Sequence, residues 1–211
     1  MLTTLNKEQK QLFTHLYQWS KQKCSNTDTQ PFHIFLTGGA GTGKSQVIKC
    51  ITNESRKLFS KTAESPDDVT FLLVAFTGTA AFNINKQTIY SAFSIFSTSL
   101  PYKPLGQDEL NTLRIKYCSL ELLIIDEISM VDQNMLMYIH ARLQQIKRTS
   151  HTIPFGNVAV LAVGDFHQIP PVKGKPLFKQ DPGSLVDLWS LFSICNKQYQ
   201  LLTFTKQYVQ F

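Results

Sequence analysis

The stretch HIFLTGGAGTGKS, residues 33–45, decides how this chain folds. Its first five residues form a short apolar run typical of a buried strand, and glycines follow at once. Residues 38–45 match the pattern GxxxxGK(S/T), which wraps nucleotide phosphates when it lies between a strand and a helix. Backbone N–H groups and the positive end of the helix dipole then meet the phosphate charge. We therefore predict a nucleotide site here, and a helix that continues after Gly43 to about Phe59.

This loop carries two side chains with specific roles. Lys44 is expected to reach the β and γ phosphates, and the Ser45 hydroxyl to hold Mg²⁺. The alternative is a glycine-rich turn that carries Lys-Ser by chance, and the strand before it and the helix after it favour the site. The nucleotide-binding residues predicted in this segment are Gly38, Gly39, Ala40, Gly41, Thr42, Gly43, Lys44 and Ser45.

Three further apolar runs have the character of buried strands. They are FLLVAF at 71–76, ELLIID at 121–126 and VAVLAV at 158–163. Helices fit between them, at 80–96 and 132–148. Continuous apolar strands separated by helices indicate an α/β fold, a mostly parallel sheet covered by helices on both faces.

Two other segments complete this plan. Asn6 and Gln9 occupy the positions of a capping box at the start of a first helix, which polar residues from 21 to 30 end. Residues 97–111 contain two prolines and a glycine and interrupt the alternation of strands and helices. We expect them to form a small insertion in a single domain that covers residues 1–211.

Length and composition exclude several classes of protein. No apolar run approaches the roughly 18 residues that span a bilayer, and the amino terminus shows no signal-peptide pattern, so we expect no membrane association and no secretion. The four cysteines show no metal-ligand spacing and no disulfide framework, which favours an intracellular, reducing compartment. With 211 residues, the chain is long enough for one good-sized core.

The net charge of +6 hints at a polyanionic partner. Between residues 133 and 180 the only acidic residue is Asp165, so this stretch carries much of the excess. Two interpretations stay open, a surface for a polyanion or a solvated helix face followed by a basic loop. The basic residues of the stretch are Arg142, Lys147, Arg148, Lys173, Lys175 and Lys179.

The run LLIIDE, residues 122–127, supplies a pair of acids at the end of a predicted strand. Asp126 is placed to hold Mg²⁺ through water, and Glu127 to orient and deprotonate an attacking water. Such a pair indicates hydrolysis of the nucleotide. A P-loop kinase would use a substrate hydroxyl as nucleophile and would not need both acids, and two solvated acids at a strand end are the remaining alternative.

Six motifs in order resemble those of the petite integration frequency (PIF-one) family of superfamily-one DNA helicases, which is related to the RecD helicases. The resemblance implies a RecA-like first motor domain that uses ATP to move 5′ to 3′ on single-stranded DNA, with roles in DNA replication, repair or recombination. The motifs are LNKEQ at 5–9, GGAGTGKS at 38–45, FTGTAAFNI at 76–84, LLIIDEISMVD at 122–132, PFGNVAVLAVGDFHQIPPV at 154–172 and LTFTKQ at 202–207.

The resemblance assigns roles to single positions on the nucleotide side. Gln9 would read the adenine edge, with helix capping as the alternative, and Gln168 would touch the γ phosphate and report hydrolysis to the DNA side. Prolines 170 and 171 would stiffen the loop that carries Gln168. The implied catalytic residues are Lys44, Asp126, Glu127 and Gln168, and the implied nucleotide-binding set adds Asn6, Gln9 and Lys206 to the phosphate loop.

The resemblance also implies a path for single-stranded DNA. Small hydroxyls and backbone N–H groups would contact phosphates without reading sequence, although any one threonine can equally be a helix cap. Phe93 and Phe96 lie at helical spacing and are expected in the core. The DNA-contacting residues implied are Thr77, Gly78, Thr88, Tyr90, Ser91 and His167.

The chain departs from the family pattern in a few places. Asn157 stands where a second glycine is usual, and we expect the loop to tolerate it. Lys206 stands where the family has arginine; a lysine lacks the planar fork that binds phosphate oxygens, so charge stabilisation from this position is weakened.

The family's second RecA-like domain would begin about where residue 211 ends the sequence. We therefore expect the isolated domain to be a monomer that hydrolyses ATP slowly, to bind single-stranded DNA and DNA junctions, and to act in a nucleus, mitochondrion or viral replication site. Two other functions stay open, a nucleotide-dependent single-strand binding module without turnover and a P-loop phosphotransferase.

Overall fold

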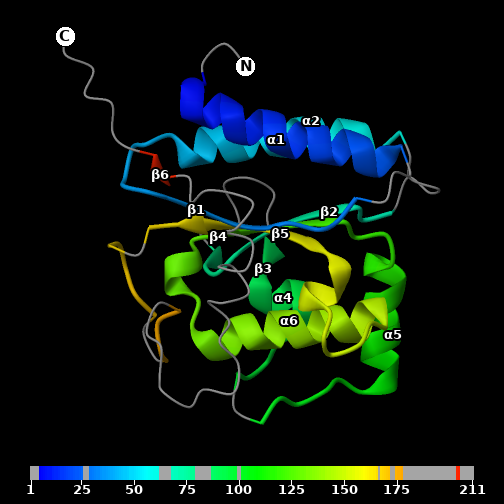
Figure 1. The fold of residues 1–211 in the computed structure, drawn as a ribbon. Coiled ribbons are helices and arrows are strands. Elements are labelled where there is room, and N and C mark those ends of the chain that lie inside the picture. Colours follow the sequence, from blue (N-terminus) through cyan, green and yellow to red (C-terminus); the bar gives the residue numbers. More distant parts are fainter. Residues whose placement is uncertain are drawn as a thin grey trace.

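The fold is built on a parallel sheet whose long strands are the predicted apolar runs (Figure 1). The computed structural model describes residues 5–25, 29–61, 68–78, 87–98, 101–165, 167–171, 174–177 and 203–204. Each long strand agrees within one residue with its prediction. The strands are β1 (His33–Gly38), β2 (Phe71–Ala75), β3 (Gln87–Thr88), β4 (Leu122–Asp126), β5 (Ala159–Gly164) and β6 (Thr203–Phe204).

Helices cover both faces of the sheet, as predicted for an α/β fold. Figure 1 shows α1 (Lys7–Cys24) and α2 (Lys44–Phe59) on one face, above the sheet in that view. On the other face lie α4 (Ile89–Phe93), α5 (Gln107–Tyr117) and α6 (Gln133–Lys147). Each face has its own apolar core, one around Leu36 and Ile48 and the other around Val74 and Ile139. Two 3-10 turns, η2 (Ile128–Met130) and η3 (Pro154–Asn157), complete the described elements.

The strand order is β3-β2-β4-β5-β1-β6, and every neighbouring pair is parallel. Thr37 of β1 is level with Gly164 of β5, and Ala75 of β2 is level with both Asp126 of β4 and Thr88 of β3. The carboxyl ends of these strands therefore meet at one edge of the sheet, where α/β proteins bind their ligands. The glycine-rich loop, Glu127 and Asp165 all begin at this edge.

The helix predicted at 80–96 is confirmed only at 89–93 in its described part. Residues 87–88 pair with β2 as β3, α4 covers only 89–93, and residues 79–86 lie outside the described range. Ser94 ends α4 because it adopts a left-handed conformation with φ 49°. Phe93 is buried as predicted, but Phe96 is 83% exposed, because helical spacing no longer holds beyond Ser94.

α5 begins inside the segment that the sequence pattern marks as an insertion. Residues 107–111 are its first turns, and Leu110, Leu113 and Tyr117 bury one side of the helix. Residues 101–106 have no regular structure. Tyr102 fastens them to α6, because its hydroxyl and the Gln145 side-chain oxygen are 2.6 Å apart.

The described basic residues between 133 and 180 do not gather on one surface. Arg142 is 2% exposed, lies under the Tyr102 ring and donates to Gln145, so it is a core residue. Lys147 and Arg148 lie at the carboxyl end of α6, whereas Lys175 contacts its amino end. Neither interpretation of the stretch, a surface for a polyanion or a solvated helix face, therefore holds for Arg142, while Lys173 and Lys179 lie outside the described residues.

None of the helices in the described part of the chain combines the length and apolar character needed to cross a membrane.

The PFGN segment, residues 154–157, turns the chain into β5 through three consecutive left-handed residues. Their φ values are 48° for Phe155, 63° for Gly156 and 67° for Asn157. The Phe155 ring is fully buried between the rings of His33 and His140, with centroid distances of 5.1 Å and 5.2 Å. Asparagine is one of the few side chains that tolerates this conformation, which explains its fit at the position of the missing glycine.

Gly156 is required by space as well as by φ. A Cβ added there would lie 2.6 Å from the carbonyl oxygen of Leu143 in α6. We predict that Gly156→Ala lowers the free energy of unfolding by about 2 kcal/mol or more, measured by urea denaturation. Gly106→Ala is the matched control, because Gly106 has φ −59° and open space around it, and its effect should stay within about 1 kcal/mol. Equal effects of the two substitutions would contradict this account.

The buried histidines make stability depend on pH. Burial lowers the pKa of His33 to about 4, a hydrogen bond with the Val158 backbone partly opposes this shift, and burial also lowers the pKa of His140. The unfolded chain therefore binds more protons than the folded chain between pH 6.5 and about 4, so stability falls as the pH falls through this window. His33 alone accounts for about 3 kcal/mol across it.

We predict that His33→Phe reduces the loss of stability between pH 7 and pH 4, measured by urea denaturation at each pH. The remaining buried histidines leave a smaller slope. His151→Phe, at an exposed position, should leave most of the pH dependence in place, because His151 contributes only by helping to lower the pKa of His140. An unchanged slope in His33→Phe would contradict the assignment.

Candidate nucleotide site and its surroundings

The glycine-rich loop joins β1 to α2 and needs glycine at two positions. Gly41 and Gly43 have φ values of 75° and 83°, in the left-handed region that glycine adopts without strain. Thr42 closes the loop, because its hydroxyl donates to the Gly39 carbonyl oxygen at 2.9 Å. Ser45 is exposed at the second position of α2, where its hydroxyl is accessible to a metal or a phosphate. The predicted loop is confirmed between its strand and its helix.

Lys44 folds back over the loop. Its ammonium group donates to the carbonyl oxygens of Gly38 and Gly39, the latter at 3.0 Å. Burial lowers the pKa of Lys44, and the carboxylates of Asp165 and Asp126 oppose this shift. The charge of Lys44 therefore faces both acidic strand ends, and it must leave the carbonyl oxygens to reach a phosphate.

Gln9 supports the loop from α1. Its side-chain oxygen accepts from the Asn6 backbone N–H at 2.9 Å, and the Gln9 N–H donates to the Asn6 side chain at 2.8 Å, so the predicted capping box is confirmed. The Gln9 amide also donates to the Thr42 carbonyl oxygen at 3.0 Å, and Gln9 is 6% exposed. A Cβ at Gly43 would lie 2.5 Å from this amide nitrogen. Sequence reasoning missed this support, because a capping pattern says nothing of contacts across 33 residues.

Asp126 and Glu127 lie half-buried where β4 ends. The Glu127 N–H donates to the Asp126 carboxylate at 3.0 Å. Glu127 has φ 56° and ψ 40°, a left-handed conformation that is uncommon for glutamate and that turns the chain sharply into η2. The Thr77 hydroxyl donates to the Glu127 carboxylate at 3.0 Å. Thr77, predicted on the DNA path, therefore contacts a predicted catalytic residue.

Asp165 organises the loop after β5. It is 5% exposed, its carboxylate accepts from the His167 N–H at 3.0 Å, and its carbonyl oxygen accepts from the Gln168 N–H at 2.9 Å. The His167 and Gln168 side chains are exposed at the nucleotide edge. Gly164 permits this turn to lie close to η2, since an added Cβ would be 2.8 Å from Ile128. Sequence reasoning did not predict Asp165 as a site residue. The feature that could have indicated it is the Gly-Asp pair at the end of an apolar strand.

The far end of the same loop is fastened to the start of α6. The Gln133 N–H donates to the Lys175 carbonyl oxygen at 3.1 Å, and the Gln133 side chain donates to the Pro176 carbonyl oxygen at 3.2 Å. Asp132 and Pro176 form an isolated antiparallel bridge. The loop that carries Gln168 is therefore anchored on β5 and again on α6.

The residues predicted to contact DNA lie around the same edge. Thr88 accepts from the Ser91 N–H at 3.2 Å and so caps α4, which is the alternative role considered for it. Tyr90 is 40% exposed, and its ring meets Phe76 edge-on at 5.8 Å. Burial raises the pKa of Tyr90, and nearby Asp132 adds to this. Gly78, Ser91 and His167 are exposed. Their DNA contacts stay predictions.

Parts of the predicted motifs lie outside the described residues. These are residues 79–84 of the FTGTAAFNI motif, Phe166 and Val172 of the motif at 154–172, and residues 202 and 205–207 of the LTFTKQ motif, which include Lys206. In the described part of the chain, no group of three or more His, Cys, Asp or Glu side chains could hold a metal by itself.

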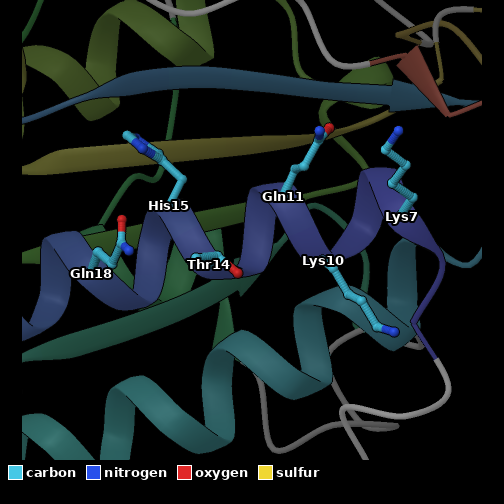
Figure 2. A pocket seen from close by; sticks show the side chains of 6 residues that line it. All are labelled: Lys7, Lys10, Gln11, Thr14, His15 and Gln18. Carbon is cyan, nitrogen blue, oxygen red and sulfur yellow. The ribbon is translucent and has the colours of Figure 1, made fainter.

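A groove runs along α1, and none of its lining residues belongs to the predicted sites. Figure 2 shows the six polar side chains that line it, with Lys10 pointing toward α2. The groove is therefore separate in its residues from the phosphate loop. It is lined by Lys7, Lys10, Gln11, Thr14, His15 and Gln18.

Fold and site together define a P-loop nucleotide-binding domain. The family model described as PIF1-like helicase matches residues 4–201 of the chain. The chain belongs to the PIF1-like helicase family.

Curated relatives agree with this assignment. The ATP-dependent DNA helicase PIF1 of Danio rerio is 37% identical over 146 residues, which cover 68% of this chain and 21% of that protein. The ATP-dependent DNA helicase RRM3 of Saccharomyces cerevisiae is 32% identical over 145 residues, 68% of this chain and 19% of that protein. The chain thus spans about a fifth of the length of these two relatives.

Solved structures share the fold. A Pif1 helicase from Bacteroides in complex with ADP-AlF3 and single-stranded DNA has a TM-score of 0.57 and 30% identity, covering 81% of this chain and 34% of that chain. The Pif1 helicase from Candida albicans has a TM-score of 0.65 and 25% identity, with 96% and 40% covered. The chain therefore has the RecA-like fold of these helicases, with its parallel sheet flanked by helices.

Gln9 can support the phosphate loop or read the adenine base, and a substitution distinguishes these two roles. If Gln9 holds the loop, Gln9→Leu should weaken ATP and GTP binding equally, by roughly tenfold, because one buried and one partly buried hydrogen bond are lost. Nucleotide titration by fluorescence or calorimetry measures this. Exposed Gln11→Leu, the matched control, should leave both affinities unchanged. A loss confined to ATP would instead show that Gln9 reads the adenine.

Proposed function

We propose that this chain is the ATP-binding and single-strand-binding motor domain of a DNA helicase that moves 5′ to 3′ and hydrolyses ATP to drive translocation. The observation that carries the proposal is the meeting of the phosphate loop, Glu127 and the Gln168 loop at one edge of the sheet. The similarity of the chain to a Bacteroides Pif1 helicase solved with ADP-AlF3 and single-stranded DNA supports the binding of a nucleotide and of single-stranded DNA. The direction of movement rests on the resemblance to the family.

The nucleotide chemistry follows from the residues at this edge. Backbone N–H groups of residues 39–45 would surround the phosphates, and Lys44 would leave the Gly38 and Gly39 carbonyls to contact them. Ser45 and Asp126 would hold Mg²⁺, which supplies charge neutralisation on the phosphates. Glu127 would orient and deprotonate the attacking water, and Gln168 would contact the γ phosphate.

The DNA path would run over the loops that follow β2 and β5 and over α4, which directly follows β3. Gly78, Ser91 and His167 are exposed there, and Tyr90 offers a partly exposed ring. Backbone N–H groups and small hydroxyls suit phosphate contacts without sequence preference. Another solved structure similar to this chain concerns the unwinding of forked double-stranded DNA by two coordinating Pif1 helicases, which supports junctions as substrates.

The whole helicase requires a second RecA-like domain, which we place in the rest of the intact protein. This chain spans 34% to 40% of the two solved helicases compared above. Translocation needs two domains that close on one nucleotide, because alternating grip on DNA requires relative motion. The 211-residue chain is therefore expected to be a monomer that hydrolyses ATP slowly and does not unwind DNA.

Glu127→Gln tests the hydrolytic role. The substitution keeps the shape of the side chain but removes the base, so phosphate release should fall at least about 100-fold while ATP affinity is retained. Phosphate release is measured with and without single-stranded DNA. Glu121→Gln is the control, because Glu121 precedes the other end of β4 and pairs with Lys23 at 3.3 Å.

Each alternative function gives a distinct result in this assay. A binding module without turnover would release no phosphate in the unsubstituted chain, and a phosphotransferase would transfer phosphate to an acceptor. Unwinding of a tailed duplex by the 211-residue chain alone would contradict the need for a second domain.

A further inference from the structure

The hydrogen bond between Thr77 and Glu127 joins the predicted DNA path to the predicted base. Thr77 lies two residues beyond Ala75 of β2, and Glu127 lies one residue beyond Asp126 of β4. The register pairs Ala75 with Asp126, so the two side chains meet directly above the end of the sheet. The Thr77 hydroxyl donates to Glu127 Oε2 at 3.0 Å, with both side chains half-buried.

The strand order gives this bond a direction. β4 has β2 on one side and β5 on the other, and β1 with the phosphate loop lies beyond β5. A bond to Thr77 therefore draws the Glu127 carboxylate toward β2 and away from the phosphate loop. A base in this position is turned from the place where an attacking water must be activated.

The chemistry of threonine makes the bond competitive. The hydroxyl carries a single hydrogen, so it can donate to the Glu127 carboxylate or to a DNA phosphate oxygen, but not to both at full strength. Gly78, the next residue, is exposed, and Phe76, the preceding residue, packs against the partly exposed Tyr90 ring. Thr77 thus lies between an accessible surface and Glu127.

We propose that Thr77 is a positioning residue that restrains Glu127, and that a DNA phosphate which takes the Thr77 hydrogen bond releases the carboxylate toward the nucleotide. This inference rests on the proposed function. It names the contact through which single-stranded DNA raises ATP hydrolysis at this site.

The test compares phosphate release without DNA in the unsubstituted chain, Thr77→Val and Thr77→Ser. Valine has the shape of threonine but no hydroxyl, so the carboxylate is released and the DNA-free rate should rise about tenfold. Serine keeps the donor and should keep the low rate. Thr112→Val, on the exposed face of α5, is the matched control and should behave as the unsubstituted chain.

A single-stranded oligothymidylate then tests the link to DNA. It should raise the rate of the unsubstituted chain and of Thr77→Ser, and it should add little to Thr77→Val. Circular dichroism melting checks that each variant is folded.

The outcomes distinguish this inference from the proposed function. An unchanged or lower DNA-free rate in folded Thr77→Val overturns the restraint, while a Glu127-dependent rate in the unsubstituted chain leaves the proposed function standing. A rise that Thr77→Ser shares also overturns it, because the hydroxyl would then not matter. If the unsubstituted chain releases no phosphate, the proposed function fails and the inference fails with it.

Discussion

The parallel pairing of β1, β2, β4 and β5 is the constraint on which the site depends. Its register sets Thr37 level with Gly164 and Ala75 level with Asp126. These strands are apolar on both faces, so a slip of one residue would exchange the side chains that pack into the two cores, and the packing of both cores therefore favours the observed register. The same register delivers the loops with polar side chains to one edge, because parallel strands end on the same side.

A second feature is common to these loops: each is held by a hydrogen bond from a buried or half-buried polar side chain. Gln9 of α1 holds the phosphate loop at Thr42, Asp165 holds the turn that carries Gln168, and Thr77 holds Glu127. Burial of a polar group costs free energy unless the group is hydrogen-bonded, so burial favours each of these contacts. Movement of the phosphate loop or of Glu127 must therefore break a specific contact with another segment, with Gln9 or with Thr77.

The sequence alone predicted the features that depend on local residue patterns, namely the long strands and the cap of the first helix. Apolar runs located the long strands within one residue, and the Asn6 and Gln9 spacing located the capping box. It was insufficient where the outcome depends on contacts distant in the chain. Phe96 lies outside the core because the left-handed conformation of Ser94 ends the helix before it. Arg142 is buried because its guanidinium group stacks on the Tyr102 ring and donates a hydrogen bond to Gln145. The contact between Thr77 and Glu127 spans 50 residues and follows only from strand order, which pattern alone does not supply.

A crystal structure of the 211-residue chain with Mg²⁺ and a non-hydrolysable ATP analogue would test the central claim most directly. The account predicts that the phosphates lie in the loop of residues 38–45, that the Lys44 ammonium group leaves the Gly38 and Gly39 carbonyl oxygens to contact them, and that Ser45 and Asp126 face the metal. A nucleotide bound elsewhere, such as along the α1 groove of Lys7 and Lys10, with Lys44 still folded on the carbonyl oxygens, would contradict it.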